Sequence, residues 1–261
     1  MTTSAPTPSS PAGFDRWQLP AHVAQAVWRG TEVGAAAGRA LPTGFEVLDA
    51  ALPGGGWPTQ GLSEVLLAQA ALCEWRLLAP ALPGFLAGRD SRIYLVAPPK
   101  PPNAMGLAQL GLAPQQLVWI DVKAPADSLW AAEQLIKSEA AGAVLVWLPQ
   151  ARPEQIRRLQ VQALHCDAPV FVFRPEAALR DASPAPLRVS VALGKSWGID
   201  LRIRKRRGAS ADEVLHLRAL PANLQSILPP RLHELQTPEV QREEVFHALG
   251  QPLAAAQRIA H

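Results

Sequence analysis

The residues that could take part in nucleotide chemistry lie directly after the first predicted strand, residues 64–67. A phosphate-binding loop follows its strand and opens a helix, with a lysine on the outer phosphates and a Ser or Thr on the magnesium ion. The segment here, residues 68–78, reads AQAALCEWRLL and contains no glycine, lysine or hydroxyl residue. The charge of Glu74 would also repel a phosphate. The segment therefore lacks the groups that bind a nucleotide triphosphate.

The end of a later predicted strand also lacks a residue that ATP hydrolysis requires. The buried run AVLVW, residues 143–147, ends in Trp147, where an ATPase of this type needs an aspartate for the magnesium ion. These two independent losses argue against ATP hydrolysis. We therefore expect no enzymatic activity, no catalytic residues and no cofactor.

Two glycine motifs match catalytic patterns only superficially. The cluster PGGGWP, residues 53–58, precedes a strand rather than following one, so we interpret it as a turn. The segment GKSWG, residues 194–198, matches both the end of a phosphate loop and a nucleophile elbow. However, the leading glycine of a phosphate loop would fall at Val189, inside an alternating strand, and a strand rather than a helix follows the serine. We expect a hairpin turn there, and the 6 histidines and 2 cysteines show no metal-ligand spacing.

One dense cluster of positive charge is present although the net charge is only +3. It comprises Arg202, Arg204, Lys205, Arg206 and Arg207. On a hairpin, such residues can contact DNA phosphates or an acidic partner. A solvated edge strand protected by charge explains them equally well. No aromatic residue interrupts the cluster, so base stacking is not indicated.

The elements that must position these residues follow from hydrophobic periodicity. Short apolar runs recur about every 25 to 30 residues with helical patterns between them, which is typical of βαβ units. The predicted strands are residues 64–67, 93–97, 117–120, 143–147 and 170–173, and amphipathic helices are predicted at 126–140 and 153–165. After residue 186 the period changes to two, in three runs near 187–193, 199–204 and 214–217. The fold class is therefore α/β, with a mainly parallel sheet flanked by helices and a C-terminal antiparallel meander.

Composition limits the class of protein further. With 48% hydrophobic and 18% charged residues, the bulk of the 261-residue chain must fold. No apolar stretch reaches the roughly 18 residues of a membrane span, so we expect a cytoplasmic protein. We divide the chain into a disordered leader (1–20), one domain (21–227) and a tail (228–261) with a short helix. In that helix Val245, Ala248 and Leu249 can form an apolar strip, which fits docking into a partner's groove and fits packing back on the main domain equally well.

Residues 41–65, LPTGFEVLDAALPGGGWPTQGLSEV, resemble the segment that precedes the phosphate loop in the RecA family. The matching positions are Thr43-Gly44, Leu48-Asp49, Gly55-Gly56 and Glu64. The resemblance covers roughly residues 39–220 and implies a RecA-like core for the main domain. The family's nucleotide-binding lysine and hydroxyl would fall at Cys73 and Glu74, and its catalytic glutamate near Pro98 or Pro99. None of these roles carries over.

Within that family, the erased phosphate loop and the late strand running into KRRG are most similar to the ImuA group. This resemblance implies an accessory protein of the damage-induced SOS response. Its partners would be an ImuB-like Y-family protein, RecA and, indirectly, an error-prone C-family DNA polymerase of translesion synthesis, with weak DNA contact at most. A cell-division inhibitor of the SulA type, which shares a shortened RecA-like core, remains the alternative.

Overall fold

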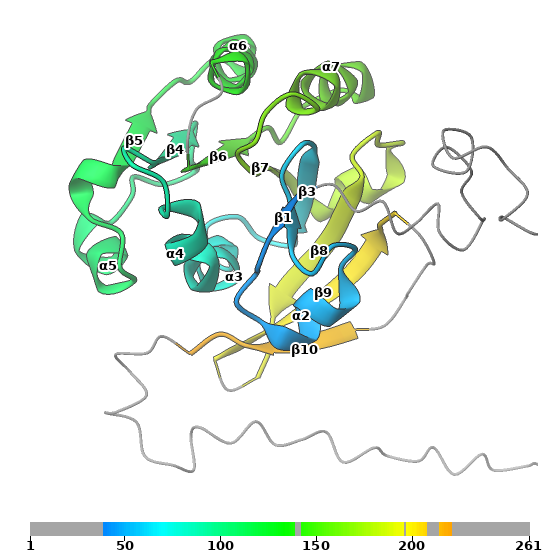
Figure 1. The fold of residues 1–261 in the computed structure, drawn as a ribbon. Coiled ribbons are helices and arrows are strands. Elements are labelled where there is room, and N and C mark those ends of the chain that lie inside the picture. Colours follow the sequence, from blue (N-terminus) through cyan, green and yellow to red (C-terminus); the bar gives the residue numbers. More distant parts are fainter. Residues whose placement is uncertain (1–38, 139–141, 196, 208–213, 221–261) are drawn as a thin grey trace, which may run out of the picture.

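Eight strands form one mixed sheet in the part of the chain that the computed structural model describes, residues 39–138, 142–195, 197–207 and 214–220 (Figure 1). From edge to edge the order is β10 (Val214–Arg218), β9 (Gly198–Lys205), β8 (Leu187–Leu193), β3 (Leu62–Leu67), β7 (Val170–Pro175), β6 (Gly142–Trp147), β4 (Arg92–Val96) and β5 (Leu117–Ile120). Strands β8 to β5 pair in parallel, whereas β9 is antiparallel to both β8 and β10. The structure confirms the α/β class, the five predicted strands and the antiparallel C-terminal extension.

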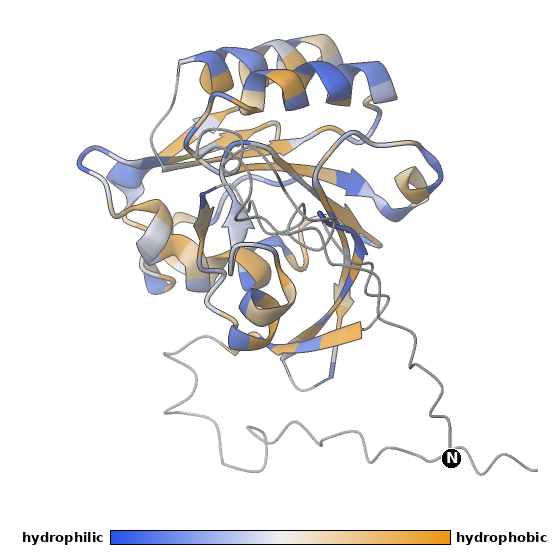
Figure 2. Cartoon of the chain, turned by 45° about the vertical axis from the view of Figure 1, so that its right-hand side comes forward, coloured by the Kyte–Doolittle hydropathy of each residue, from blue (hydrophilic) through white to orange (hydrophobic). Residues whose placement is uncertain are grey.

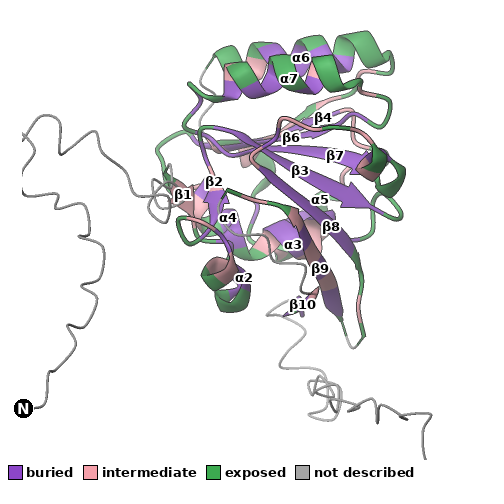
Figure 3. Ribbon diagram, turned by 90° about the vertical axis from the view of Figure 1, so that its right-hand side faces the viewer, coloured by how far each residue is buried: buried purple, intermediate pink, exposed green. Residues whose placement is uncertain are grey.

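Helices cover both faces of the parallel strands (Figures 1 and 3). On one face, α6 (Pro125–Lys137) and α7 (Pro153–Ala163) contribute Ile136, Ile156 and Leu159 to a core shared with β6 and β7. The other face is covered by α2 (Glu46–Ala51), α3 (Glu74–Leu78), η2 (Ala79–Ala81), α4 (Leu82–Phe85) and α5 (Ala104–Gln109). Two further short turns are η3 (Pro114–Gln116) and η4 (Glu176–Arg180). Figure 2 shows the strands as mostly hydrophobic and the outer sides of α6 and α7 as largely hydrophilic.

The two predicted helices exist but are shorter than expected. Each begins with a proline at its first position, where the missing N–H costs no helical hydrogen bond. The helix α6 ends at Lys137, with Ser138 as its C-cap and the Ser138 Oγ donating to the Leu135 carbonyl over 2.9 Å, and the expected end at residue 140 lies outside the described residues. The helix α7 stops at Ala163, two residues before the expected end.

The glycine-rich segment forms a turn, as predicted, and leads into a small second sheet. Strands β1 (Ala40–Leu41) and β2 (Trp57–Pro58) pair antiparallel. A Cβ on Gly56 would lie 2.0 Å from the Leu41 carbonyl oxygen, so only glycine fits there. Trp57 is fully buried and meets Phe171 edge to face, with ring centroids 5.2 Å apart. The turn thus anchors this segment on the central sheet.

A buried cluster of charges joins the three central strands. Glu64 on β3 is fully buried and pairs with Arg174 on β7 (Nη1 to Oε1, 2.8 Å) and with Arg188 on β8 (Nε to Oε2, 2.9 Å). Arg174 also pairs with Asp181 over 2.8 Å. Glu64 is the buried carboxylate that both arginines share, and Asp181, whose side chain is 42% exposed, supplies the second negative charge; pairing of this kind is the condition for keeping charges in an apolar interior. Glu64 therefore has a structural role at this position.

Several predicted features lie outside the described residues. These are the leader at 1–20, the tail at 228–261 with its helix, and the apolar strip of Val245, Ala248 and Leu249. Within the described ranges, none of the helices has the length and apolar character needed to cross a membrane.

Candidate functional site

The loop after β3, residues 68–73, lies at the carboxyl edge of the parallel strands. Ligands of open α/β sheets bind at this edge, so the loop is the first place to look for a site. Ala71 adopts a left-handed conformation there, with φ of 67°, which residues other than glycine rarely adopt. Two backbone N–H groups of the loop, those of Ala71 and Cys73, point toward Glu74 at the start of α3.

These N–H groups bind a carboxylate of the same chain. The Glu74 side chain is 2% exposed and accepts hydrogen bonds from the backbone N–H of Ala71 (2.7 Å) and of Cys73 (3.1 Å). Backbone N–H groups that converge after a strand are the means by which such loops hold phosphate. In this protein the two amides are already satisfied by an internal anion.

Trp147 completes the surroundings of that carboxylate. Its indole Nε1 donates a hydrogen bond of 3.1 Å to the Glu74 Oε1, and its ring stacks on Phe173 with centroids 4.7 Å apart. An indole N–H donates only and offers no lone pair to a metal ion. The sequence singled out Glu74 and Trp147 separately, as two losses from an ATPase site. The structure brings them together as one buried hydrogen-bonded pair.

The thiol beside this pair has a pKa above the usual value for cysteine. Burial raises the pKa of Cys73, and the nearby Glu74 carboxylate raises it further, whereas Arg76 acts in the opposite direction. A nucleophilic cysteine needs a lowered pKa. Cys73 thus has the environment of an inert core residue.

The segment at 194–198 forms the predicted hairpin turn between β8 and β9. Gly194 donates to the Gly198 carbonyl over 3.0 Å, which closes the turn. Trp197 at its tip packs against Arg76 of α3, with the guanidinium carbon 5.4 Å from the ring centroid. The hairpin therefore leans on the same end of the sheet as the Glu74 loop, and Ser196 lies outside the described residues.

A wider cleft of about 820 Å³ opens beside this site, at the ends of β4, β5 and β6. Pro98 and Pro99 line it, at the positions where the family resemblance would place a catalytic glutamate. Among the described residues that line the cleft, the charged ones are Lys123 and Arg152, and there is no aspartate or glutamate. Across the described ranges, no group of three or more His, Cys, Asp or Glu side chains is arranged to hold a metal ion.

The five basic residues predicted to contact DNA or a partner are divided between the two faces of the sheet. Arg202 and Arg204 project from β9 on one face, where the Arg204 Nε donates to the Ser190 Oγ over 2.7 Å. Lys205 ends the strand, and its Nζ donates to the Ser183 carbonyl over 2.7 Å. Arg206 reaches the opposite face and donates to the Ala51 carbonyl of α2. A contact of these residues with DNA stays a prediction, and a ligand on one face would meet only part of the cluster.

Comparison of the chain with protein-family models finds no match. Comparison with curated protein sequences also finds none.

Proposed function

We propose that this protein is a non-enzymatic adaptor of damage-induced translesion DNA synthesis, with a RecA-like core that has lost its nucleotide chemistry. Its direct partners would be an ImuB-like Y-family protein and RecA, through which it would support an error-prone C-family polymerase. The motif at residues 41–65 and the parallel core with its antiparallel extension support this assignment. Surface recognition is the function left to a fold that has discarded its site.

The observation that carries the proposal is the carboxylate of Glu74 bound by the backbone N–H groups of Ala71 and Cys73. A triphosphate at this loop would have to displace a buried anion from its three donors. The indole of Trp147 stands where a magnesium-binding aspartate would be required, and it binds the same carboxylate. Both features favour a protein that binds partners without turning over ATP.

A pull-down with the purified full-length chain tests the proposal. The chain is incubated with the ImuB-like protein, with RecA and with the division GTPase, each with and without Mg-ATP. Capture of the ImuB-like protein or RecA, to the same extent with and without ATP, supports the adaptor function. A variant lacking residues 228–261 then shows whether the tail carries the contact, since loss of capture would assign docking to it.

Two outcomes would overturn the proposal. Capture of the division GTPase alone, together with filamentous cells on overexpression, would make the protein a division inhibitor of the SulA type. ATP turnover that is abolished by substitutions within residues 67–75 would make it an ATPase. A contaminating ATPase cannot produce the second outcome, because substitutions in this chain would leave the contaminant's activity unchanged.

A further inference from the structure

The cleft of about 820 Å³ beside the Glu74 loop lies where the connections of the sheet change direction. After β4 the chain turns to α5 on one face of the sheet, whereas after the neighbouring β6 it turns to α7 on the opposite face. The loops that leave these two strands therefore diverge. Open α/β sheets bind their ligands at such a point, outside the carboxyl ends of the strands. The position of the cleft thus favours a ligand site.

The size and lining of the cleft also suit a small molecule. Ligand sites are commonly clefts of about 300 to 1,000 Å³, lined mainly by apolar side chains with a few polar groups. Leu129, Trp147 and Leu148, all of them buried, give this cleft an apolar wall. Ser128 and Gln155 add polar groups. The cleft therefore has the room and the apolar surface to cover a ring-sized organic body.

The walls of the cleft have a stiff backbone. Four of the described lining residues are prolines: Pro98, Pro99, Pro125 and Pro149. The pyrrolidine ring of each proline fixes its φ angle. Ala97, at the end of β4, adopts a left-handed φ of 51°, and its backbone N–H donates to the Ile120 carbonyl of β5 over 3.0 Å. A site that is already formed loses less conformational entropy when a ligand binds.

Two of the loops around the cleft carry positive charge. Lys123 comes from the loop between β5 and α6, and Arg152 from the loop between β6 and α7. Lys123 pairs with Asp121 over 2.5 Å, but these side chains are 85% and 45% exposed, so the pair is weak. The acidic side chain nearest to Arg152 in the chain, Glu154, lines a separate hollow together with Arg157. The cleft therefore favours a negatively charged ligand.

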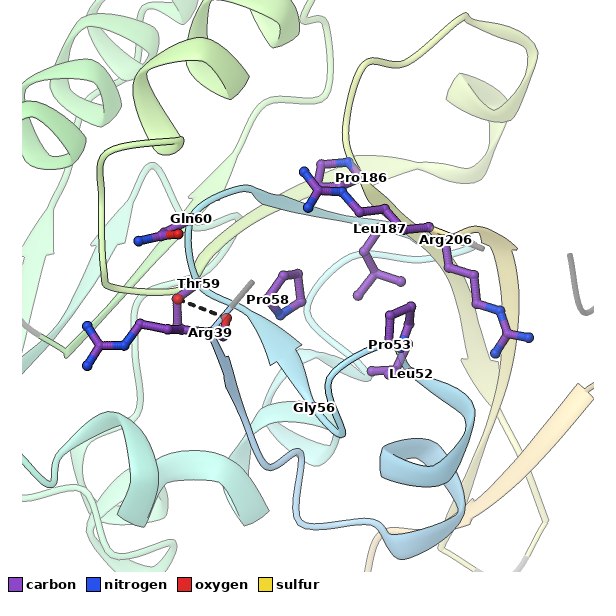
Figure 4. Close-up of a pocket in the computed structure, with 11 residues that line it drawn as sticks. Arg39, Leu52, Pro53, Gly56, Pro58, Thr59, Gln60, Pro186, Leu187 and Arg206 are labelled. Atoms are coloured by element: carbon purple, nitrogen blue, oxygen red, sulfur yellow. Dashed lines mark hydrogen bonds between the residues drawn. The ribbon is translucent and has the colours of Figure 1, made fainter. Parts of the chain in front are cut away.

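A second hollow, at the amino ends of β3 and β8, is much smaller (Figure 4). Arg39, Arg206 and Arg207 are among its lining residues, and Figure 4 shows Arg39 and Arg206 on opposite sides of Pro58. Its volume is about 50 Å³, which is room for roughly three to five water molecules. A ring-sized body does not fit there, so the cleft at β4 and β6 is the candidate.

We infer that this cleft binds a small organic anion. The apolar body of the ligand lies against Leu129, Trp147 and Leu148, and its carboxylate or phosphate lies toward Lys123 and Arg152. The loops that form the cleft all belong to the continuously described segments 39–138 and 142–195. A nucleic-acid strand fits less well, because Trp147 is the one aromatic side chain in the described lining and it is buried. The inference is independent of the proposed function, since neither the partners nor the lost ATP chemistry enters it.

The test is a fluorescence titration of the full-length chain with anilinonaphthalene sulfonate, an organic anion that becomes bright in apolar surroundings. Phenylnaphthylamine has the same rings without the sulfonate and is the neutral probe. The key variant is Arg152→Gln, and Arg92→Gln makes the same charge change at the amino end of β4. Ala126→Trp fills the cleft from the exposed start of α6, whereas Gln134→Trp adds the same side chain further along α6, outside the lining. Circular dichroism confirms that each variant is folded.

We expect saturable binding of the sulfonate that weakens at high salt. Arg152→Gln should weaken the sulfonate about fivefold and the neutral probe by less than about twofold, and Arg92→Gln should change either probe by less than about twofold. Ala126→Trp should weaken both probes by at least about fivefold, and Gln134→Trp neither. No saturable binding, equal effects within either pair of variants, or equal loss of the two probes in Arg152→Gln would overturn the inference.

Competition then distinguishes the charged group of the ligand. Naphthoate and naphthyl phosphate present the same rings with a carboxylate or a phosphate, and the one that displaces the sulfonate at the lower concentration identifies the preferred group. Equal displacement by both supports the shared chemistry, whereas displacement by neither would overturn the inference. Displacement by a single-stranded oligothymidylate that is lost in Arg152→Gln would also overturn it, in favour of a nucleic-acid groove.

Discussion

The Nε1 of Trp147 donates a 3.1 Å hydrogen bond to the carboxylate of Glu74, a residue 73 positions earlier in the chain. This bond ties the end of β6 to the start of α3, over the strand β7 that lies between β6 and β3. The stacking of Trp147 on Phe173 of β7 completes the bridge. The edge of the sheet at which α/β proteins ordinarily hold a ligand is here fastened by the protein's own side chains.

The Glu74–Trp147 bond should be measurable as a coupling in stability. Trp147→Phe keeps an aromatic ring against Phe173 but removes the N–H, so we expect it to lower the free energy of unfolding by about 1 to 2 kcal/mol. Glu74→Gln should cost more, about 2 to 3 kcal/mol, because the loop amides lose a charged acceptor. The double variant should fall short of the sum, as determined by urea denaturation. Strict additivity would show that the two groups do not interact, and Trp130→Phe on the exposed side of α6 serves as the control.

Substitution of the buried Glu64 should lower the free energy of unfolding more than substitution of Glu74 or Trp147. Glu64→Gln leaves Arg174 and Arg188 without their shared carboxylate, so we expect a decrease in unfolding free energy of about 3 to 5 kcal/mol. Lys123→Gln removes an exposed partner of Asp121 instead, with side chains 85% and 45% exposed, and should cost less than about 1 kcal/mol. Thermal unfolding followed by circular dichroism compares the two. Similar losses in both variants would contradict the structural role assigned to Glu64.

The close packing at Gly56 predicts a steric clash on substitution, and Gly84 offers a control position. A methyl group at Gly56 would meet the backbone of Leu41, so Gly56→Ala should destabilise the protein by about 1 to 3 kcal/mol. A Cβ on Gly84 in α4 would meet nothing within 4 Å. Gly84→Ala should therefore be neutral or stabilise by about 0.5 to 1 kcal/mol, because alanine favours helix. The order of the two melting temperatures is the measurement, and the reverse order would refute the packing described at β1 and β2.

Because its pKa is raised, Cys73 should be alkylated slowly, and the reaction should begin only at a higher pH than for free cysteine. Only the thiolate reacts, and burial with the nearby Glu74 charge disfavours it, so reaction with iodoacetamide should begin at higher pH than for free cysteine. Glu74→Gln removes the second cause and should move the onset to lower pH. Mass spectrometry of the Cys73 peptide across pH 7 to 10 gives the rates. Faster alkylation of Cys73 than of free cysteine near pH 7.5 would contradict this environment.

The strands and the two long helices were predictable because their signals are local. In β3 all six residues are buried, which appears in the sequence as a continuous apolar run broken only by Ser63 and Glu64. The alternation of apolar and polar residues marked β8 and β9 as strands, and in β9 the apolar residues are buried while the polar ones between them are partly exposed; in β8 the polar Arg188 and Ser190 are buried as well. Helix ends were predicted less accurately: α7 ends at Ala163 and not at residue 165, because the hydrophobic period does not mark the last turn of a helix. The sequence alone also shows that residues 68–78 contain no phosphate-binding residues.

The sequence by itself determined the α/β class, the antiparallel extension and the loss of nucleotide-binding groups, because hydrophobic period and residue type are written locally. Only the tertiary structure decided that Glu74 meets Trp147, that Glu64 pairs with Arg174 and Arg188, and that Arg206 and Arg207 join Arg39 around a hollow. Each of these contacts depends on which strands become neighbours and where each strand ends. Periodicity carries no record of strand order, so residues far apart in the chain meet only once the sheet is assembled.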